Sequence, residues 1–270
     1  MAFNQNYTTP QNNASLLISP RAKSVWGPWP TIGFTLVILV VFFIAQGIVV
    51  AVPALSAFAS YNGPPLTSQD AATDFVMDQI NDKLGLYQSI ATIVSCAAGV
   101  FMIWVFINAR KGAKIKEYLA LKKIKVKTIV LAVIITFAVV FLADLMLSWL
   151  GTNDPEPIME RIYNTSVLPW LFWISVIVFA PLFEEALFRG FLYEGLARAW
   201  GVYVAVMLTA FGWSALHAAQ YATGGVIYIF VLGLAMGIVR WRTGSIWPTC
   251  IMHATVNLVA SIALATNFNI

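Results

Sequence analysis

The chain has 270 residues, of which 60% are hydrophobic and 10% are charged, and its 16 basic and 12 acidic side chains give a formal net charge of +4. A soluble domain has about 45–50% apolar and about 25% charged residues, so this composition excludes a soluble globular fold, a disordered chain and a coiled coil. The small net charge excludes a nucleic-acid-binding domain as well. The composition therefore predicts an all-α polytopic membrane protein, because transmembrane helices satisfy their own backbone hydrogen bonds in lipid.

Charged residues are clustered, and the stretches between the clusters are long enough to span a bilayer, which takes about 20 apolar residues. In chain order these stretches are residues 32–59, 84–109, 128–150, 162–183, 199–239 and 243–270. The stretch 199–239 has 41 residues and is predicted to hold two spans, with a break at Gly224 and Gly225. We therefore expect a bundle of about seven to eight spans, preceded by a disordered tail over residues 1–31.

Lysine and arginine in short loops predict which end of a bundle faces the cytoplasm. The loop 110–127 holds eight basic residues and one acid, Glu117, and is predicted to be cytoplasmic. The clusters at 70–83 and 154–161 have net charges of −3 and −2 and are predicted to face outward. This alternation predicts a multi-pass protein of the cytoplasmic membrane with its N-terminus in the cytoplasm.

Ionisable side chains inside apolar stretches are costly in a bilayer and are functional candidates by default. Glu184 and Glu185 are adjacent at the end of one apolar run, and Glu185 precedes Arg189 by four residues, which favours an ion pair on one helix face. Glu184 has no cation on its own helix, and we expect it to be the reactive carboxylate, with the other two side chains structural. The alternative is that all three form one interhelical salt-bridge cluster.

The two histidines of the chain also lie in apolar segments, each four residues from an aromatic or polar side chain. Trp213 and His217 share one helix face, and so do His253 and Asn257. An imidazole and an amide on one face can both donate hydrogen bonds to an oxyanion. Taken singly, these pairs are also consistent with packing or with interhelical hydrogen bonds.

Together these segments supply one carboxylate, two imidazoles and one amide from three separate spans. Such a set suits the activation of water and the stabilisation of a tetrahedral oxyanion, which amide hydrolysis requires. The sequence contains no HExxH, Walker or GxGxxG motif and no serine nucleophile elbow, so the better-known hydrolytic and nucleotide-binding signatures do not apply.

The segments resemble motifs of the CPBP family, which comprises CAAX proteases and bacteriocin-processing enzymes and is also named Abi. Four blocks carry the resemblance: residues 184–190 (EEALFRG) are similar to EExxxR, 213–217 (WSALH) to FxxxH, 242–247 (RTGSIW) to a short turn, and 253–257 (HATVN) to HxxxN. Tryptophan at position 213 replaces the phenylalanine of the family motif. The resemblance covers about residues 168–265, and the blocks occur in family order.

The resemblance implies an intramembrane endopeptidase similar to CAAX prenyl proteases, which hydrolyses peptide bonds of membrane-associated substrates. It implies roles for seven residues: water activation by Glu184 and His217, an oxyanion hole from His253 and Asn257, and structural support from Glu185, Arg189 and Trp213. On this interpretation residues 32–160 are three N-terminal membrane spans, and residues 161–270 are the catalytic core.

Two further questions stay open at this point. We expect no metal or other cofactor, and the alternative is Zn²⁺ bound by Glu184, His217 and His253, because two histidines and one glutamate make a catalytic zinc set. The functional alternatives are a non-catalytic member that acts in bacteriocin self-immunity or as a membrane scaffold, and a transporter or proton relay. The expected partners are the lipid bilayer and a membrane-associated peptide substrate, and not nucleic acid.

The depth of the candidate residues constrains the fold. His217 lies about 22 Å into a span that enters from the cytoplasmic end, whereas Glu184 belongs to the preceding span. The two side chains can meet only if the helix of Glu184 continues, so we predict one helix of about 30 residues from Leu168, with Glu194 beyond the membrane as a solvated residue. We expect a polar cavity within the bilayer, reached from the cytoplasmic side or laterally.

Overall fold

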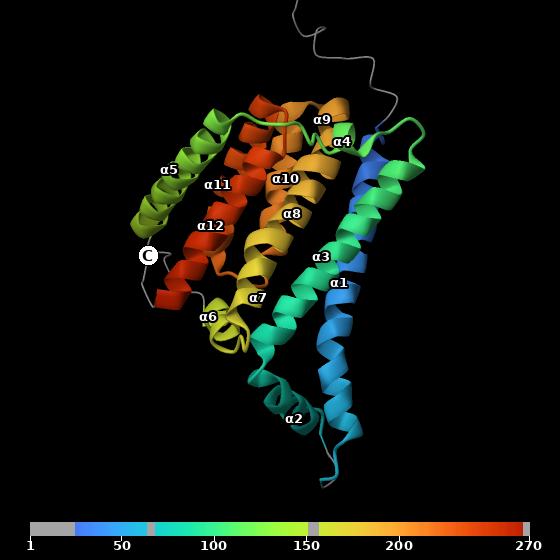
Figure 1. Cartoon of the computed structure of the whole chain (residues 1–270), viewed down its shortest axis with the longest axis vertical. Coiled ribbons are helices and arrows are strands. Elements are labelled where there is room, and N and C mark those ends of the chain that lie inside the picture. The colour runs from blue at the N-terminus through green and yellow to red at the C-terminus, as the bar shows by residue number, and fades with distance from the viewer. Residues whose placement is uncertain (1–24, 64–67, 151–156, 267–270) are drawn as a thin grey trace, which may run out of the picture.

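The computed structural model describes residues 25–63, 68–150 and 157–266, and the described chain is a bundle of helices (Figure 1). Six helices are long and apolar enough to cross a membrane, and α10 (Val202–Leu216) is apolar but shorter. The long helices are α1 (Pro28–Ala59), α3 (Leu84–Ala109), α5 (Val126–Leu150), the composite helix Pro169–Trp200, α11 (Thr223–Thr243) and α12 (Trp247–Thr266). The predicted all-α polytopic bundle is confirmed, whereas the expected seven to eight spans become six long helices and the shorter α10 in the described part of the chain.

Helix α1 begins at Pro28, a position in the first helical turn where the missing N–H of proline is not needed. The start of the helix is anchored to the end of α3, because the Trp26 indole donates to Phe106 O at 2.9 Å. The predicted tail over residues 1–31 is therefore wrong for its last four residues, which are helical. Residues 1–24 of that predicted tail lie outside the described residues.

The bundle has two chemically different ends (Figure 1). The start of α1, the short helix α4 (Ile115–Tyr118) and the lysine-rich loop 110–127 lie at one end, which we call the basic end. At the opposite end, which we call the acidic end, lie α2 (Gln69–Asn81), with three of its thirteen residues aspartate, and α6 (Pro157–Asn164). The chain therefore separates its charges along the bundle axis.

The helix that carries Glu184 is continuous over Pro169–Trp200, 32 residues, which confirms the prediction of one helix of about 30 residues from Leu168. Its segments are α7 (Pro169–Ile174), π-helical η3 (Ser175–Phe179), α8 (Ala180–Glu185), π-helical η4 (Ala186–Leu192) and α9 (Tyr193–Trp200). π-Helical turns inside longer helices occur frequently at functional sites. Here they flank α8, and Glu184 lies near the middle of the composite helix, about 22 Å from its first residue.

Helix α10 is too short to cross the apolar part of a bilayer. Its 15 residues extend about 22 Å, whereas the hydrocarbon core is about 30 Å thick. A turn over residues 217–222 follows, and α11 begins at Thr223. The predicted break at Gly224 and Gly225 is therefore wrong, because both glycines lie in the first turn of α11 and the break precedes them.

A glycine in α3 fixes how closely the composite helix approaches. A Cβ atom built on Gly99 would overlap the ring of Phe183, the residue before Glu184. The same ring stacks on Phe42 of α1, with ring centroids 4.8 Å apart. Phe183 is therefore held between α1 and α3, and this packing sets the position of the neighbouring carboxylate.

This packing predicts unequal effects for the same substitution at two glycines. Gly99→Ala is expected to lower the free energy of unfolding by about 1–3 kcal/mol, because the added methyl group displaces the Phe183 ring in a packed core. Gly47→Ala in α1, where a Cβ atom would meet nothing within 4 Å, is the matched control and is expected to leave it unchanged or raise it by up to about 1 kcal/mol, because alanine is the better helix former. Thermal unfolding in detergent measures both, and equal melting temperatures would contradict the packing argument.

Candidate active site

The four residues predicted to be catalytic line one cavity of about 450 Å³. Glu184 reaches it from α8, His217 from the end of α10, and His253 and Asn257 from α12. The structure thus brings together side chains that are up to 73 positions apart in the sequence. Whether each one has the predicted chemical role stays a prediction.

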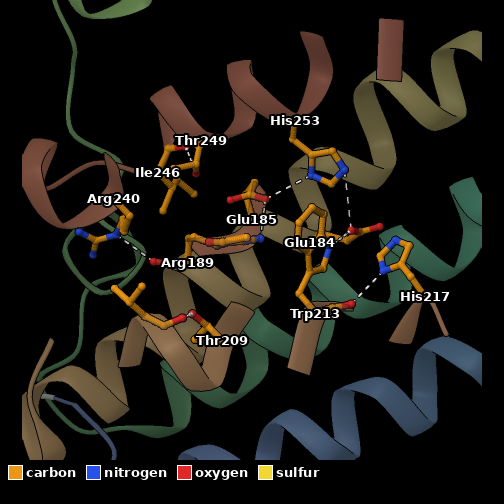
Figure 2. A network of polar contacts seen from close by, with 12 residues as sticks. Glu184, Glu185, Arg189, Thr209, Trp213, His217, Arg240, Ile246, Thr249 and His253 are labelled. Carbon is orange, nitrogen blue, oxygen red and sulfur yellow. Dashed lines mark hydrogen bonds and ion pairs between the residues drawn. The ribbon is translucent and has the colours of Figure 1, made fainter. Parts of the chain in front are cut away.

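The Trp213 indole is the centre around which the ionisable groups are arranged (Figure 2). Its Nε1–H donates to Glu184 Oε2 at 2.5 Å. Its ring makes edge contacts with both imidazoles, at centroid distances of 5.4 Å to His217 and 5.1 Å to His253. The hydrogen bond that holds the Glu184 carboxylate therefore comes from a neutral donor, which itself contacts both histidines.

The Glu185 carboxylate points the other way, into the protein interior, and is fully buried. Arg189 Nη1 donates to Glu185 Oε1 at 2.8 Å, which confirms the ion pair predicted from the spacing of four residues. The arginine guanidinium lies over the Trp213 ring, 4.5 Å from the centroid, and also donates to Gly233 O in α11. The pair thus joins the composite helix to α10 and α11 instead of forming a cluster with Glu184.

Glu185 also orients one of the histidines. His253 Nδ1 lies 3.2 Å from Glu185 Oε1, and its Nε2 lies 3.9 Å from Glu184 Oε2 (Figure 2). A carboxylate only accepts hydrogen bonds, so Nδ1 carries the proton. The opposite edge of the ring, with Nε2, is then directed at Glu184 and the cavity.

The tautomer of His217 is set by the end of its helix. The backbone N–H of His217 donates to Ser214 O, three residues earlier in the chain. In a regular α-helix this N–H would donate to Trp213 O, so that carbonyl is left for another donor. His217 Nδ1 lies 2.8 Å from this carbonyl, which accepts the Nδ1–H. In the neutral ring Nε2 then carries a lone pair, which is the form a base requires.

Asn257 satisfies a carbonyl that a proline leaves without a donor. Ala180 N–H donates to Ser175 O, five residues back, and in this register Val176 O would be paired with the N–H of residue 181, which is proline. Asn257 Nδ2 donates to Val176 O at 2.6 Å instead. One amide N–H thus holds α12 against η3, and the second remains for the cavity that Asn257 lines.

A polar network at the basic end was missed by the sequence analysis. Glu194 Oε1 lies 2.6 Å from Arg198 Nη2, and Glu194 Oε2 lies 3.2 Å from Arg240 Nη2. Arg240 is 5% exposed and also donates to Arg189 O at 2.8 Å. The prediction of a solvated Glu194 is therefore wrong. Glu194 precedes Arg198 by four residues, and this spacing is a sequence signal for their ion pair. Nothing in the sequence indicates that Arg240, and not Arg242, is buried beside Glu194.

The alternative zinc set is not formed as a ligand cluster. Among the described residues, no group of three or more His, Cys, Asp and Glu side chains is arranged to hold a metal ion. The Nδ1 atoms of His217 and His253 already face Trp213 O and Glu185. The expectation of a metal-free site stays a prediction.

Comparisons with known proteins agree with the motifs. Residues 166–259 match the family model described as type II CAAX prenyl endopeptidase Rce1-like, which confirms the resemblance to the CPBP family. The chain is also similar to a protein of Escherichia coli named "Uncharacterized 24.3 kDa protein", with 24% identity over 189 residues that cover 66% of this chain and 83% of the relative. No solved structure gives a significant match.

The two adjacent glutamates are predicted to respond differently to the same substitution. Glu185→Gln leaves Arg189 buried without its counter-ion and is expected to lower the free energy of unfolding by about 3–5 kcal/mol. Glu184→Gln is the matched control, because the new amide still accepts the Trp213 N–H, and it is expected to change stability by less than about 1 kcal/mol. Unfolding of both purified variants measures this difference. A stable Glu185→Gln variant would show that the ion pair does not hold the site.

Proposed function

We propose that this chain, whose residues 166–259 match the Rce1-like type II CAAX prenyl endopeptidases, is an intramembrane endopeptidase that hydrolyses peptide bonds of membrane-associated substrates. One observation carries the proposal. A carboxylate that pairs with no lysine or arginine, Glu184, and an imidazole whose Nε2 lone pair is free, His217, line the same cavity within a bundle of membrane-spanning helices. This is the arrangement that activation of a water molecule requires.

The reaction divides into two proton transfers. Water held between Glu184 and His217 attacks the carbonyl carbon of the scissile peptide bond, and its proton passes to the Glu184 carboxylate. The C–N bond of the tetrahedral intermediate then breaks, and the protonated carboxyl group gives that proton to the leaving nitrogen. The products are a carboxylic acid and an amine, and at neutral pH the acid loses its remaining proton and the amine takes one up. No redox partner or covalent enzyme intermediate is needed.

The oxyanion of the intermediate requires donors that are in place before the reaction. The second N–H of Asn257 is one such donor, because the first is held by Val176 O and fixes the amide in orientation. His253 supplies another from Nε2 when its ring is protonated, with its Nδ1–H facing Glu185. Glu185, Arg189 and Trp213 act through these groups and are positioning residues.

The complete set of polar groups in one cavity favours an enzyme over the non-catalytic alternatives. Immunity or scaffolding does not require a carboxylate that faces an internal cavity without a cation. Such a group is costly in a membrane unless the cavity holds water, and water is the second reactant of hydrolysis.

The proposal predicts that Glu184→Gln abolishes cleavage, with a loss of about 10²-fold or more, because the amide cannot accept the proton of water. The measurement compares the N- and C-termini of membrane proteins in cells that lack the chain with cells that carry the parent chain or the variant. Asp144→Asn is the matched control, since Asp144 is an exposed carboxylate of α5 that does not line the cavity. Unchanged cleavage by the Glu184→Gln variant would refute the assignment of the base.

The expectation of a metal-free reaction is tested separately. Elemental analysis of the purified protein is expected to find no stoichiometric zinc, and cleavage is expected to persist after treatment with a chelator. Zinc at one equivalent, lost together with activity, would overturn this expectation and would favour the alternative of a zinc enzyme.

A further inference from the structure

We infer that the catalytic cavity opens at the acidic end of the bundle, on the non-cytoplasmic side, and that its substrate is a polypeptide segment in or beside that half of the membrane. The inference deepens the proposed function and rests on it. It departs from the expectation of access from the cytoplasmic side.

The first argument is the direction in which the cavity extends from Glu184. Apart from the site residues, its lining includes side chains from the elements that meet at the acidic end, among them Leu84, Gln88, Ile158, Met159, Gln220 and Leu264. Leu84 is the first residue of α3, and residues 158 and 159 belong to α6. No lining residue comes from the lysine-rich loop 110–127. The cavity therefore extends toward one end only.

The second argument is the short helix α10. It begins at the basic end and stops after about 22 Å. Beyond its last residue, the half of the bundle toward the acidic end therefore has no helix in line with α10. The turn 217–222, which includes the exposed Gln220, takes its place. A turn with backbone groups outside regular helices is tolerated at membrane depth only where it is buried in protein or lines a water-filled cavity.

The third argument is that packed side chains separate the catalytic cavity from the basic end, where a second pocket, lined by Glu194, Arg198 and Arg240 among others, shares no lining residue with it. Between Glu184 and that end, residues 186–193 of the composite helix are all buried, and Leu119 and Ala120 of the basic loop are buried as well. The loop is fastened to the turn before α12, since Ile246 N–H donates to Ala120 O and the Ser245 hydroxyl donates to Lys122 O. A substrate that approaches from the basic end thus meets packed side chains.

The fourth argument is the orientation of the two ends. The basic loop, Arg198 at the end of α9 and Arg242 at the end of α11 share one end, and the aspartates of α2 lie at the other. An excess of lysine and arginine in short loops marks the cytoplasmic side. The open end of the cavity is therefore the non-cytoplasmic end.

The cavity also has a side that faces lipid. Phe43 of α1 lines it and is 50% exposed on the lipid-facing surface of the bundle. Phe43 therefore separates the cavity from the surface that faces lipid, which is the side from which a segment anchored in the bilayer approaches. These openings together select membrane-anchored polypeptides whose scissile bond lies in the non-cytoplasmic half.

Accessibility of single cysteines tests the direction of the cavity without requiring catalysis. Gln88→Cys and Gln220→Cys place a thiol on the cavity lining near the open end, and Lys123→Cys places one in the exposed basic loop. The parent chain, in which Cys96 and Cys250 are both buried, is run alongside to subtract any reaction of Cys96, which also lines the cavity. Each chain is treated with a bulky, membrane-impermeant maleimide in right-side-out and in inverted vesicles, and the labelled fraction is followed by mass shift.

We expect both cavity variants to react about tenfold or more faster in right-side-out vesicles, and Lys123→Cys to react faster in inverted ones, because only solvent-exposed thiols react readily. Labelling of all three variants from the same side would contradict a cavity that opens at the acidic end. Faster labelling of the two cavity variants in inverted vesicles, and of Lys123→Cys in right-side-out ones, would show that the acidic end faces the cytoplasm. The comparison of protein termini supplies a second test. Glu184-dependent cleavage of peptide bonds on the non-cytoplasmic side supports the inference, and cleavage of bonds on the cytoplasmic side overturns it. Failure of the proposed function would instead abolish Glu184-dependent cleavage and leave the labelling pattern unchanged.

Discussion

The buried ion pair between Glu185 and Arg189 is the interaction on which the site depends. Both side chains are removed from solvent, so their attraction must offset a large desolvation cost, and the net gain in stability from such a pair is small. Its effect is geometric. The carboxylate orients His253, and the guanidinium lies over the Trp213 ring, so one pair fixes side chains from α12 and α10 against the composite helix.

The two adjacent glutamates have different surroundings because successive residues on a helix point about 100° apart. One carboxylate turns into the packed interior and is neutralised there. The other, Glu184, turns into the cavity, where it accepts a hydrogen bond from the neutral Trp213 indole. This separation lets a reactive carboxylate exist within a membrane bundle, because the structural charge beside it is compensated and the reactive one is not.

Irregular backbone creates the space and the donors that the site uses. Helix α10 ends near mid-depth, which exposes Trp213 O to the His217 ring and leaves room for the cavity. Pro181 leaves Val176 O for the Asn257 amide. A regular bundle of full-length helices would fill this space and pair these carbonyls internally. The same irregularity, together with the distribution of charge along the axis, decides from which side the cavity is open.

The sequence by itself determined the features that follow from composition and from spacing along one helix: the apolar spans, the long helix from Pro169, the pairing of Glu185 with Arg189, and the set of polar residues that line the cavity. These are local properties, since residues four apart on a helix are neighbours in any fold. Only the tertiary structure decided what lies between distant segments: the Trp213 indole between two imidazoles, the Asn257 link to η3, the burial of Arg240 beside Glu194, and the end at which the cavity opens. Helix boundaries at Pro28 and Thr223 also escaped prediction. The physical reason is that packing between helices, and not the hydropathy of each one, selects the partner of every buried polar group.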